Sequence, residues 1–317
     1  MPVATPPPIR RIPLGLRYMA GSALFFSLMT LFVKLAGQRV PAMEIVFARS
    51  VFMVAGTYAL LRRTGTPPLG HNRRLLLARG VIGATALSLF YWAIPRIPLG
   101  DATALFYVTP IWTAVAAAFV LRERTAGRVV AGMVVSLLGV ALIAKPSLLF
   151  GDSAAGLDPL AVTATVTASI LSGLVYTIVR KLRETDAPNV IIFYLSVAGI
   201  VLALPFAGSW VVPQGVEWLW LLGAGATTLV AQIFLTHGLH LEQAGRAMSI
   251  GYLQVVFAFV WGLFVFGNVP DGWSLGGAAL IVGSVLLIAR QRAAGGGSVG
   301  APASRSPARS SAHTGMR

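Results

Sequence analysis

The sequence predicts an all-α membrane protein with ten transmembrane helices, arranged as two inverted five-helix repeats. Of the 317 residues, 56% are hydrophobic and 11% are charged, whereas a soluble domain carries about 25% charged residues. We therefore expect lipid to be the main solvent. The second half also repeats the first at an offset of 144 residues, in the pairs Phe90/Phe234, Ala114/Ala258, Gly132/Gly276, Gly139/Gly283 and Leu142/Leu286. Because five spans per repeat is an odd number, the second copy must enter the membrane from the opposite side, as in transporters built from inverted repeats.

Ten segments have about the 20 mostly apolar residues that a spanning helix needs. They are 18–36, 43–61, 77–95, 102–121, 128–144, 158–179, 190–208, 217–236, 247–266 and 273–290. These spans define a first repeat at 16–145 and a second at 157–290. The flanking pieces are an N-terminal segment, 1–15, and a C-terminal tail, 291–317, whose small polar composition predicts disorder.

Basic residues between the spans predict the orientation. If the N-terminus is cytoplasmic, 20 of the 25 Lys and Arg residues fall in cytoplasmic segments and 3 fall in the opposite ones, with Arg79 counted at a cytoplasmic edge. The positive-inside rule then puts both termini in the cytoplasm. The excess of arginine over lysine, 22 to 3, is typical of a GC-rich bacterial genome, and we expect a bacterial inner membrane.

The same composition limits partners and cofactors. The net charge of +15 lies in short gaps between apolar runs, so topology explains it and no nucleic-acid partner is predicted. The chain has no cysteine, hence no disulfide or thiolate metal site. His237 and His240 have no neighbouring carboxylate or thiol to complete a metal site. We expect no cofactor; the predicted partners are the bilayer and a small-molecule substrate, and the sequence leaves a homodimer open.

Several local patterns resemble the drug/metabolite transporter superfamily, EamA type. The apolar stretch SALFFSLMT leads to Lys34, and P-x-x-E-I-V-F-x-R follows from Pro41 to Arg49. Later come D-A-T-A-L, Pro110, L-R-E-R and a glycine-spaced fifth span. The resemblance covers about residues 16–290 and implies a ten-span inner-membrane carrier with a central cavity shared by the two halves. Two departures occur: Arg122 replaces a usual glycine, and Gly267 stands where the second copy would repeat Glu123.

Arg49 is the most informative single residue. It lies within the second span, where insertion of an arginine costs about 2.5–3.5 kcal/mol. The functional interpretation is that Arg49 binds an anionic group of the substrate, such as a carboxylate. The structural alternatives are that it neutralises Glu44 or that its side chain reaches the outer headgroups. Glu44 either binds a proton or substrate amine, or completes a charge cluster with Lys34 and Arg49 that closes the outer vestibule.

A set of aromatic and amide side chains falls within the spans and is expected to line the substrate site. Its members are Tyr91, Tyr107, Trp112, Gln232, Tyr252 and Gln254. Gln254 aligns with Pro110 in the repeat, and a mid-span amide needs a partner. Pro110 removes a backbone hydrogen bond and can leave a carbonyl free to face a cavity. Glu123, beside two arginines, is expected to anchor its loop by an ion pair, with a role in an inner gate as the alternative.

The remaining patterns concern packing and the class of protein. Gly132 and Gly139, repeated as Gly276 and Gly283, predict close helix contacts. No span holds a nucleophile with a histidine base or paired acids, so no catalytic residue and no enzyme are predicted. We expect a secondary transporter of a small polar or amphipathic metabolite, with efflux favoured by the family resemblance. The alternatives are an uptake carrier for an S-adenosylmethionine-like or nucleotide-sugar-like substrate, a channel, and an intramembrane enzyme.

Overall fold

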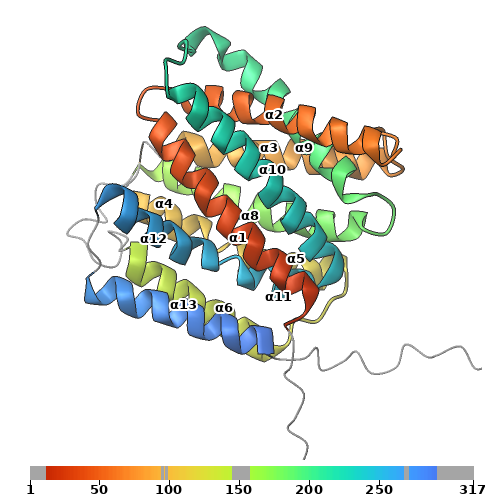
Figure 1. Cartoon of the computed structure of the whole chain (residues 1–317). Coiled ribbons are helices and arrows are strands. Elements are labelled where there is room, and N and C mark those ends of the chain that lie inside the picture. The colour runs from red at the N-terminus through yellow and green to blue at the C-terminus, as the bar shows by residue number, and fades with distance from the viewer. Residues whose placement is uncertain (1–11, 94–95, 97–98, 145–157, 268–270, 291–317) are drawn as a thin grey trace, which may run out of the picture.

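The protein is an all-helical bundle in the part of the chain that the computed structural model describes, residues 12–93, 96, 99–144, 158–267 and 271–290 (Figure 1). Most of the predicted N-terminal segment and the whole predicted tail, 291–317, lie outside the described residues. The helices are α1 (Leu14–Ala36), α2 (Ala42–Arg63), α3 (Arg73–Ala93), α4 (Leu99–Phe106), α5 (Thr109–Val120), α6 (Gly127–Ala144), α8 (Pro159–Leu182), α9 (Pro188–Ala203), η2 (Leu204–Ser209), α10 (Glu217–Leu241), α11 (Ala244–Ile250), α12 (Leu253–Phe266) and α13 (Gly272–Arg290).

The predicted spans correspond to these helices, with one systematic difference. Among the described residues, nine helical stretches are long and apolar enough to cross a bilayer, and one of them joins α11 to α12. The one remaining predicted span, 102–121, which is the fourth along the chain, is divided between α4 and α5. The fourth span of each repeat is therefore discontinuous, whereas the sequence predicted continuous helices.

Proline and aspartate mark several helix starts. Pro159 and Pro188 occupy the first positions of α8 and α9, where the missing N–H of proline costs no helical hydrogen bond. Asp158 caps α8 by accepting a hydrogen bond from the backbone N–H of Leu160 at 2.9 Å. These local signals fix where the spans of the second repeat begin.

The two repeats interlock. α1 packs against α10, and α8, the equivalent of α1, packs against α3, the equivalent of α10. Glycines permit this close packing: a Cβ on Gly223 of α10 would meet the ring of Phe32, and one on Gly21 of α1 would meet the ring of Phe234. Residue numbers fall along α10 as they rise along α1, so these helices run antiparallel. Each repeat therefore completes the core of the other.

The contact between α6 and α13 shows the inversion directly. Gly132 lies against Ile288, and the Ser136 and Ser284 hydroxyl oxygens are 2.6 Å apart, so the two equivalent helices run antiparallel. The two helices come closest at Gly139 and Gly277. A Cβ added to either glycine would collide with the backbone carbonyl oxygen of the other. The predicted glycine contact is therefore correct for Gly132 and Gly139. It is wrong for Gly276 and Gly283, where an added Cβ would meet no atom within 4 Å.

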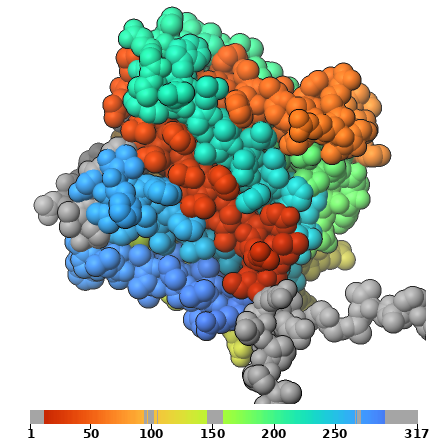
Figure 2. Space-filling model, viewed as in Figure 1, coloured from red at the N-terminus to blue at the C-terminus, as the bar shows by residue number. Residues whose placement is uncertain are grey.

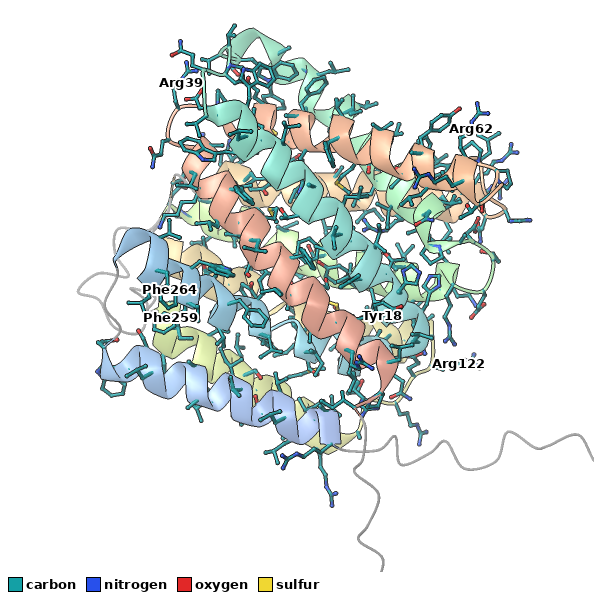
Figure 3. All side chains as sticks on the ribbon, viewed as in Figure 1. Tyr18, Arg39, Arg62, Arg122, Phe259 and Phe264 are labelled. Atoms are coloured by element: carbon teal, nitrogen blue, oxygen red, sulfur yellow. The ribbon has the colours of Figure 1, made fainter. Side chains whose placement is uncertain are left out.

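The outer surface of the bundle is apolar along its sides and charged at its ends. Phe119 and Phe264 are 82% and 77% exposed, which suits a bilayer and not water. Figure 2 shows how closely the helices pack on one face of the bundle, and Figure 3 shows Arg39 at one end with Arg62 and Arg122 at the other. The end where α1 begins and α13 ends is called the near end below, and the opposite end the far end. The protein is a multi-pass membrane protein.

Candidate functional site

The fourth span of each repeat breaks at the same place. α4 ends at Phe106 and α5 begins at Thr109, while α11 ends at Ile250 and α12 begins at Leu253. The two breaks, at 107–108 and 251–252, are separated by the repeat offset of 144 residues. Discontinuous helices at equivalent positions of two inverted repeats mark the binding sites of secondary transporters.

Pro110 explains the first break. A helical residue at 110 would donate its N–H to the carbonyl of Phe106, and proline has no N–H. The hydroxyl of Thr109 donates to that carbonyl instead, at 2.6 Å. The expectation that Pro110 leaves a carbonyl free to face a cavity is therefore wrong, because Thr109 satisfies the oxygen locally.

The second break has a different chemical cause. Its turn begins at Gly251, whose N–H donates to Met248 O at 3.0 Å, and the N–H of Gln254 donates to Gly251 O at 3.0 Å. Glycine destabilises a helix interior by about 1 kcal/mol relative to alanine, and these tighter turns replace the regular helical bonds. Proline in one repeat and glycine in the other thus produce the same interruption.

The two breaks meet through a pair of tyrosines. The ring centroids of Tyr107 and Tyr252 are 6.2 Å apart at an interplanar angle of 30°, and the side chain of Tyr252 is fully buried. Trp112 packs next to Gly173 of α8, and Gln254 is half-buried. The structure therefore brings Tyr107 and Tyr252 together, while their predicted contact with substrate stays a prediction.

Several buried polar atoms inside the spans have no protein partner. Buried polar groups are normally hydrogen-bonded, so each exception needs an explanation. Five of these atoms lie on α1, α5 and α10 and at the second break: Ser22 Oγ, Trp112 Nε1, Gln232 Oε1, Thr236 Oγ1 and the Tyr252 hydroxyl. Three of the six predicted aromatic and amide residues are in this set.

Arg49 is buried and has no ion-pair partner among the described residues. It is 6% exposed, its Nε has no partner, and its Cζ lies 6.0 Å from the centroid of the Tyr91 ring. Glu44 instead accepts a hydrogen bond from the backbone N–H of Val211 at 2.9 Å. The described residues therefore show no ion pair between Arg49 and Glu44, and the role of Arg49 stays a prediction.

Contacts between the repeats close the far end. Arg39, which precedes α2, donates from Nε and from Nη2 to the two carboxylate oxygens of Glu217 at 2.8 and 2.6 Å. The same Nη2 donates to Val212 O at 2.6 Å. The hydrogen bond to Glu217 raises the pKa of Arg39 above its usual value. With the bond from Val211 to Glu44, these contacts tie the α1–α2 connection to the segment before α10.

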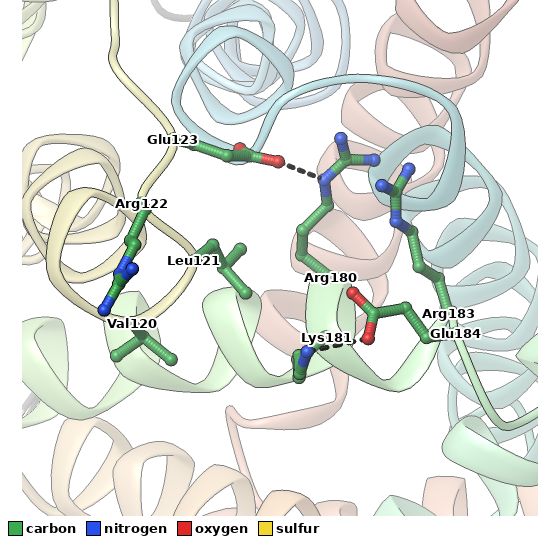
Figure 4. A pocket seen from close by; sticks show the side chains of 8 residues that line it. All are labelled: Val120, Leu121, Arg122, Glu123, Arg180, Lys181, Arg183 and Glu184. Carbon is green, nitrogen blue, oxygen red and sulfur yellow. Dashed lines mark hydrogen bonds and ion pairs between the residues drawn. The ribbon is translucent and has the colours of Figure 1, made fainter.

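A second set of contacts closes the near end. The carboxylate of Glu123 accepts from Arg180 Nε at 2.8 Å (Figure 4). It also accepts from the backbone N–H of Ala244 at 3.0 Å. Arg180 Nη1 also donates to the carbonyls of Leu239 and His240, at 2.9 and 3.1 Å. Glu123 thus forms an ion pair, and its partner is Arg180 of the other repeat rather than an adjacent arginine.

The near end carries a further pair of contacts between the repeats. Asp186, before α9, accepts from the N–H groups of His71 and Asn72 at 2.6 and 3.1 Å. The Tyr194 hydroxyl donates to Leu69 O at 3.0 Å. These bonds join the α8–α9 connection and α9 to the α2–α3 connection, just as the bond from Val211 to Glu44 joins the α9–α10 segment to the first turn of α2 at the far end.

Arg79 is a functional candidate that the sequence analysis missed. It was assigned to a cytoplasmic edge, yet it lies on α3 with 2% exposure and a partnerless Nε. Its position inside the span predicted at 77–95 is the signal that could have found it. Nothing in the sequence around Arg180 indicates its partner, Glu123, which is 57 residues away.

Comparison with known proteins assigns the family. A model described as the EamA-like transporter family matches residues 13–145 and 159–290. The chain belongs to the EamA-like transporter family. Solute carrier family 35 member G1 of Homo sapiens is 34% identical over 283 residues, which cover 86% of this chain and 77% of that protein.

A bacterial relative and a solved structure extend this comparison. Pseudopaline exporter CntI of Pseudomonas aeruginosa (strain UCBPP-PA14) is 33% identical over 269 residues, or 84% of this chain and 93% of that protein. A crystal structure with 18% identity matches with a TM-score of 0.76 over 87% of this chain and 96% of that chain, which shows a common fold. The EamA-like protein is therefore a membrane transporter and not an enzyme, as the resemblance implied.

Proposed function

We propose that this EamA-like protein is a secondary transporter that exports a small polar or amphipathic metabolite by alternating access. The observation that carries the proposal is the matched pair of broken helices, whose Tyr107 and Tyr252 rings meet between the repeats. Discontinuous helices in the corresponding spans of two inverted repeats mark the substrate sites of secondary transporters, and here the backbone at the two breaks is hydrogen-bonded within the protein. A substrate site at the junction of the repeats follows.

The closing contacts support alternating access. The Arg39–Glu217 pair and the Glu44–Val211 bond close the far end, and the Glu123–Arg180 pair closes the near end. In an inverted repeat, opening one end by moving one repeat against the other breaks one set and keeps the other set intact. Each set of contacts then acts as a gate. If Glu123 were only a static anchor for its loop, breaking its contacts would not affect the opening of the opposite end.

The near end is proposed to be cytoplasmic, in a bacterial inner membrane. Basic side chains gather there, at the end of α2, at the start of α3 and on the α5–α6 and α8–α9 connections, and the positive-inside rule assigns such connections to the cytoplasm. Both termini are then cytoplasmic. A reporter fused after Ala144 should read as external, and one fused after Arg290 as internal.

The substrate is proposed to carry an anionic group that Arg49 binds. A planar guanidinium forms a bidentate fork with carboxylate or phosphate, and Arg49 has that fork available because Glu44 is bound elsewhere. Tyr91, Trp112, Gln232 and Gln254 are proposed to complete the site. A relative named as an exporter supports efflux, with uptake as the alternative direction.

A two-stage experiment tests this function. Mass spectrometry of medium and cell extract should find metabolites that move outward when the protein is overproduced and stay inside with Arg49→Ala. Proteoliposomes loaded with the unlabelled metabolite should then accumulate its labelled form by counter-transport, which a channel cannot do. Uptake that equilibrates without an overshoot would reject the carrier mechanism, and depletion of the metabolite from the medium would reject efflux.

A further inference from the structure

Arg79 is a second buried arginine inside the bundle, and nothing described balances its charge. It is the seventh residue of α3 (Arg73–Ala93), is 2% exposed, and has no hydrogen bond or ion pair with a described residue. A guanidinium stays protonated in proteins, and a buried charge is costly unless it is paired. Arginines inside a membrane usually face a substrate or ion pathway for this reason.

The direction of the side chain argues against a lipid anchor. A Cβ added to Gly83 would collide with Arg79 Nη1, so the guanidinium lies over the helical turn that follows Arg79. On α3 that turn is farther from the near end, so the side chain extends toward the middle of the bundle. An arginine that anchors a helix in the headgroups extends the opposite way. Gly83 therefore provides room for a cation directed inward.

The groups around Arg79 are donors. Tyr176 of α8 is close enough to interact electrostatically with both Arg79 and Tyr107, and the Tyr107 ring packs on that of Tyr252. None of these three hydroxyls bonds to a described residue. Every described carboxylate lies within three residues of a helix end: Glu44, Glu123, Asp158, Glu184, Asp186, Glu217, Glu242 and Asp271. The described interior is thus rich in donors and poor in anionic acceptors.

Arg79 and Arg49 occupy matching depths from opposite ends. Arg49 is the eighth residue of α2, which starts at the far end, and Arg79 is the seventh of α3, which starts at the near end. At a rise of 1.5 Å per residue, each Cα lies about 10 Å below its end.

We propose that Arg79, with the hydroxyls of Tyr176 and Tyr107, is a second oxyanion-binding station in the near half of the pathway. The transported metabolite then carries a carboxylate or phosphate, held by Arg79 when the near end is open and by Arg49 when the far end is open. The statement that the bound anion is the transported metabolite rests on the proposed function. The anion site itself stands on the buried charge, its inward direction and the surrounding donors.

Charged thiol reagents test the site without knowledge of the substrate. The chain has no cysteine, so Tyr176→Cys introduces a single thiol beside Arg79. The purified protein is treated with sulfonatoethyl methanethiosulfonate, an oxyanion, and with its cationic trimethylammonium analogue. At the dielectric constant of water, a unit charge at a separation of about 7 Å from any thiol changes the rate of each charged reagent about threefold, in opposite directions for the two reagents. Arg79→Gln should therefore lower the ratio of anionic to cationic rates about five- to tenfold.

Matched variants separate the site from the general surface charge. Arg79→Lys should keep the ratio because the charge remains, and Arg74→Gln, an exposed residue near the start of the same helix, should leave it unchanged. If Arg79→Gln does not fold, Gly83→Ala, which displaces the guanidinium, should lower the ratio in its place. The proposal is overturned if the ratio of anionic to cationic rates is the same with and without Arg79. It is also overturned if the thiol reacts with neither reagent, even in a protein whose near end is weakened by Glu123→Ala.

The readout also distinguishes the two proposals. Labelling requires no turnover, so a protein that prefers the anionic reagent but shows no counter-transport keeps the anion site and loses the carrier mechanism. A protein that shows counter-transport, but whose labelling does not depend on Arg79, keeps the carrier mechanism and loses the anion site.

Discussion

Replacing Glu123 with alanine removes a carboxylate that joins three elements at the near end. Its two oxygens accept from Arg180 Nε and from the N–H of Ala244, and the Arg180 and Glu123 side chains are 7% and 17% exposed. Removing one partner of a buried ion pair costs about 3–5 kcal/mol. Arg180 keeps the carbonyls of Leu239 and His240 as acceptors, so we expect a loss of about 2–3 kcal/mol. Glu123→Gln, which retains an acceptor oxygen, should cost about 1–2 kcal/mol.

The assay is reversible denaturant unfolding of the purified protein in detergent micelles. The matched control is Glu184→Gln in the same shallow cavity of about 180 Å³. Glu184 pairs with Lys181 at 2.7 Å, and both side chains are about half exposed (49% and 51%). The hydrogen bond from Lys181 lowers the pKa of Glu184, yet an exposed ion pair contributes little to stability. The Glu184→Gln protein should therefore have the same free energy of unfolding as the wild type. A Glu123→Ala protein as stable as the control would refute the assignment of Glu123 as the central near-end contact.

Three further predictions concern packing and the pathway. Gly277→Leu should lower the free energy of unfolding by more than about 3 kcal/mol or prevent folding, because α6 and α13 touch at this glycine. The control, Gly276→Leu, faces open space and should match the wild type in expression and melting. Ser136→Ala and Ser284→Ala should each cost about 1 kcal/mol, and the double variant should cost less than their sum in a double-mutant cycle, because the two hydroxyls bond to each other. Arg49→Lys should slow counter-transport while expression and melting hold, since an ammonium keeps the charge but loses the planar fork; unchanged transport would remove Arg49 from the site.

The sequence predicted the spans well because membrane insertion is a local property. About 20 apolar residues and basic flanks specify each helix, and the repeat offset specified the inversion that the antiparallel α6–α13 contact shows. The helix breaks were harder to foresee, since Pro110 pointed to one and Gly251 is an ordinary glycine among the 34 in the chain.

Side-chain partners could not be predicted because they join residues far apart in the chain. Glu44 and Arg49 are neighbours in sequence, yet Glu44 bonds to Val211, 167 residues away. Gly276 and Gly277 differ by one position, and the rotation of α13 decides which of them meets α6. Arg79 lies inside the span predicted at 77–95, but the inward direction of its side chain over Gly83 is known only from the structure.

Side-specific labelling of one cysteine tests alternating access most directly. Gln254→Cys lies at the second helix break, and membrane-impermeant reagents can be applied to oriented vesicles from either side. Glu123→Ala should increase its labelling from the near side, and Glu217→Gln, which weakens the bond to Arg39, should increase it from the far side. A shift to the same side in both variants, or no reaction from either side, would contradict a carrier with two gates around a central site.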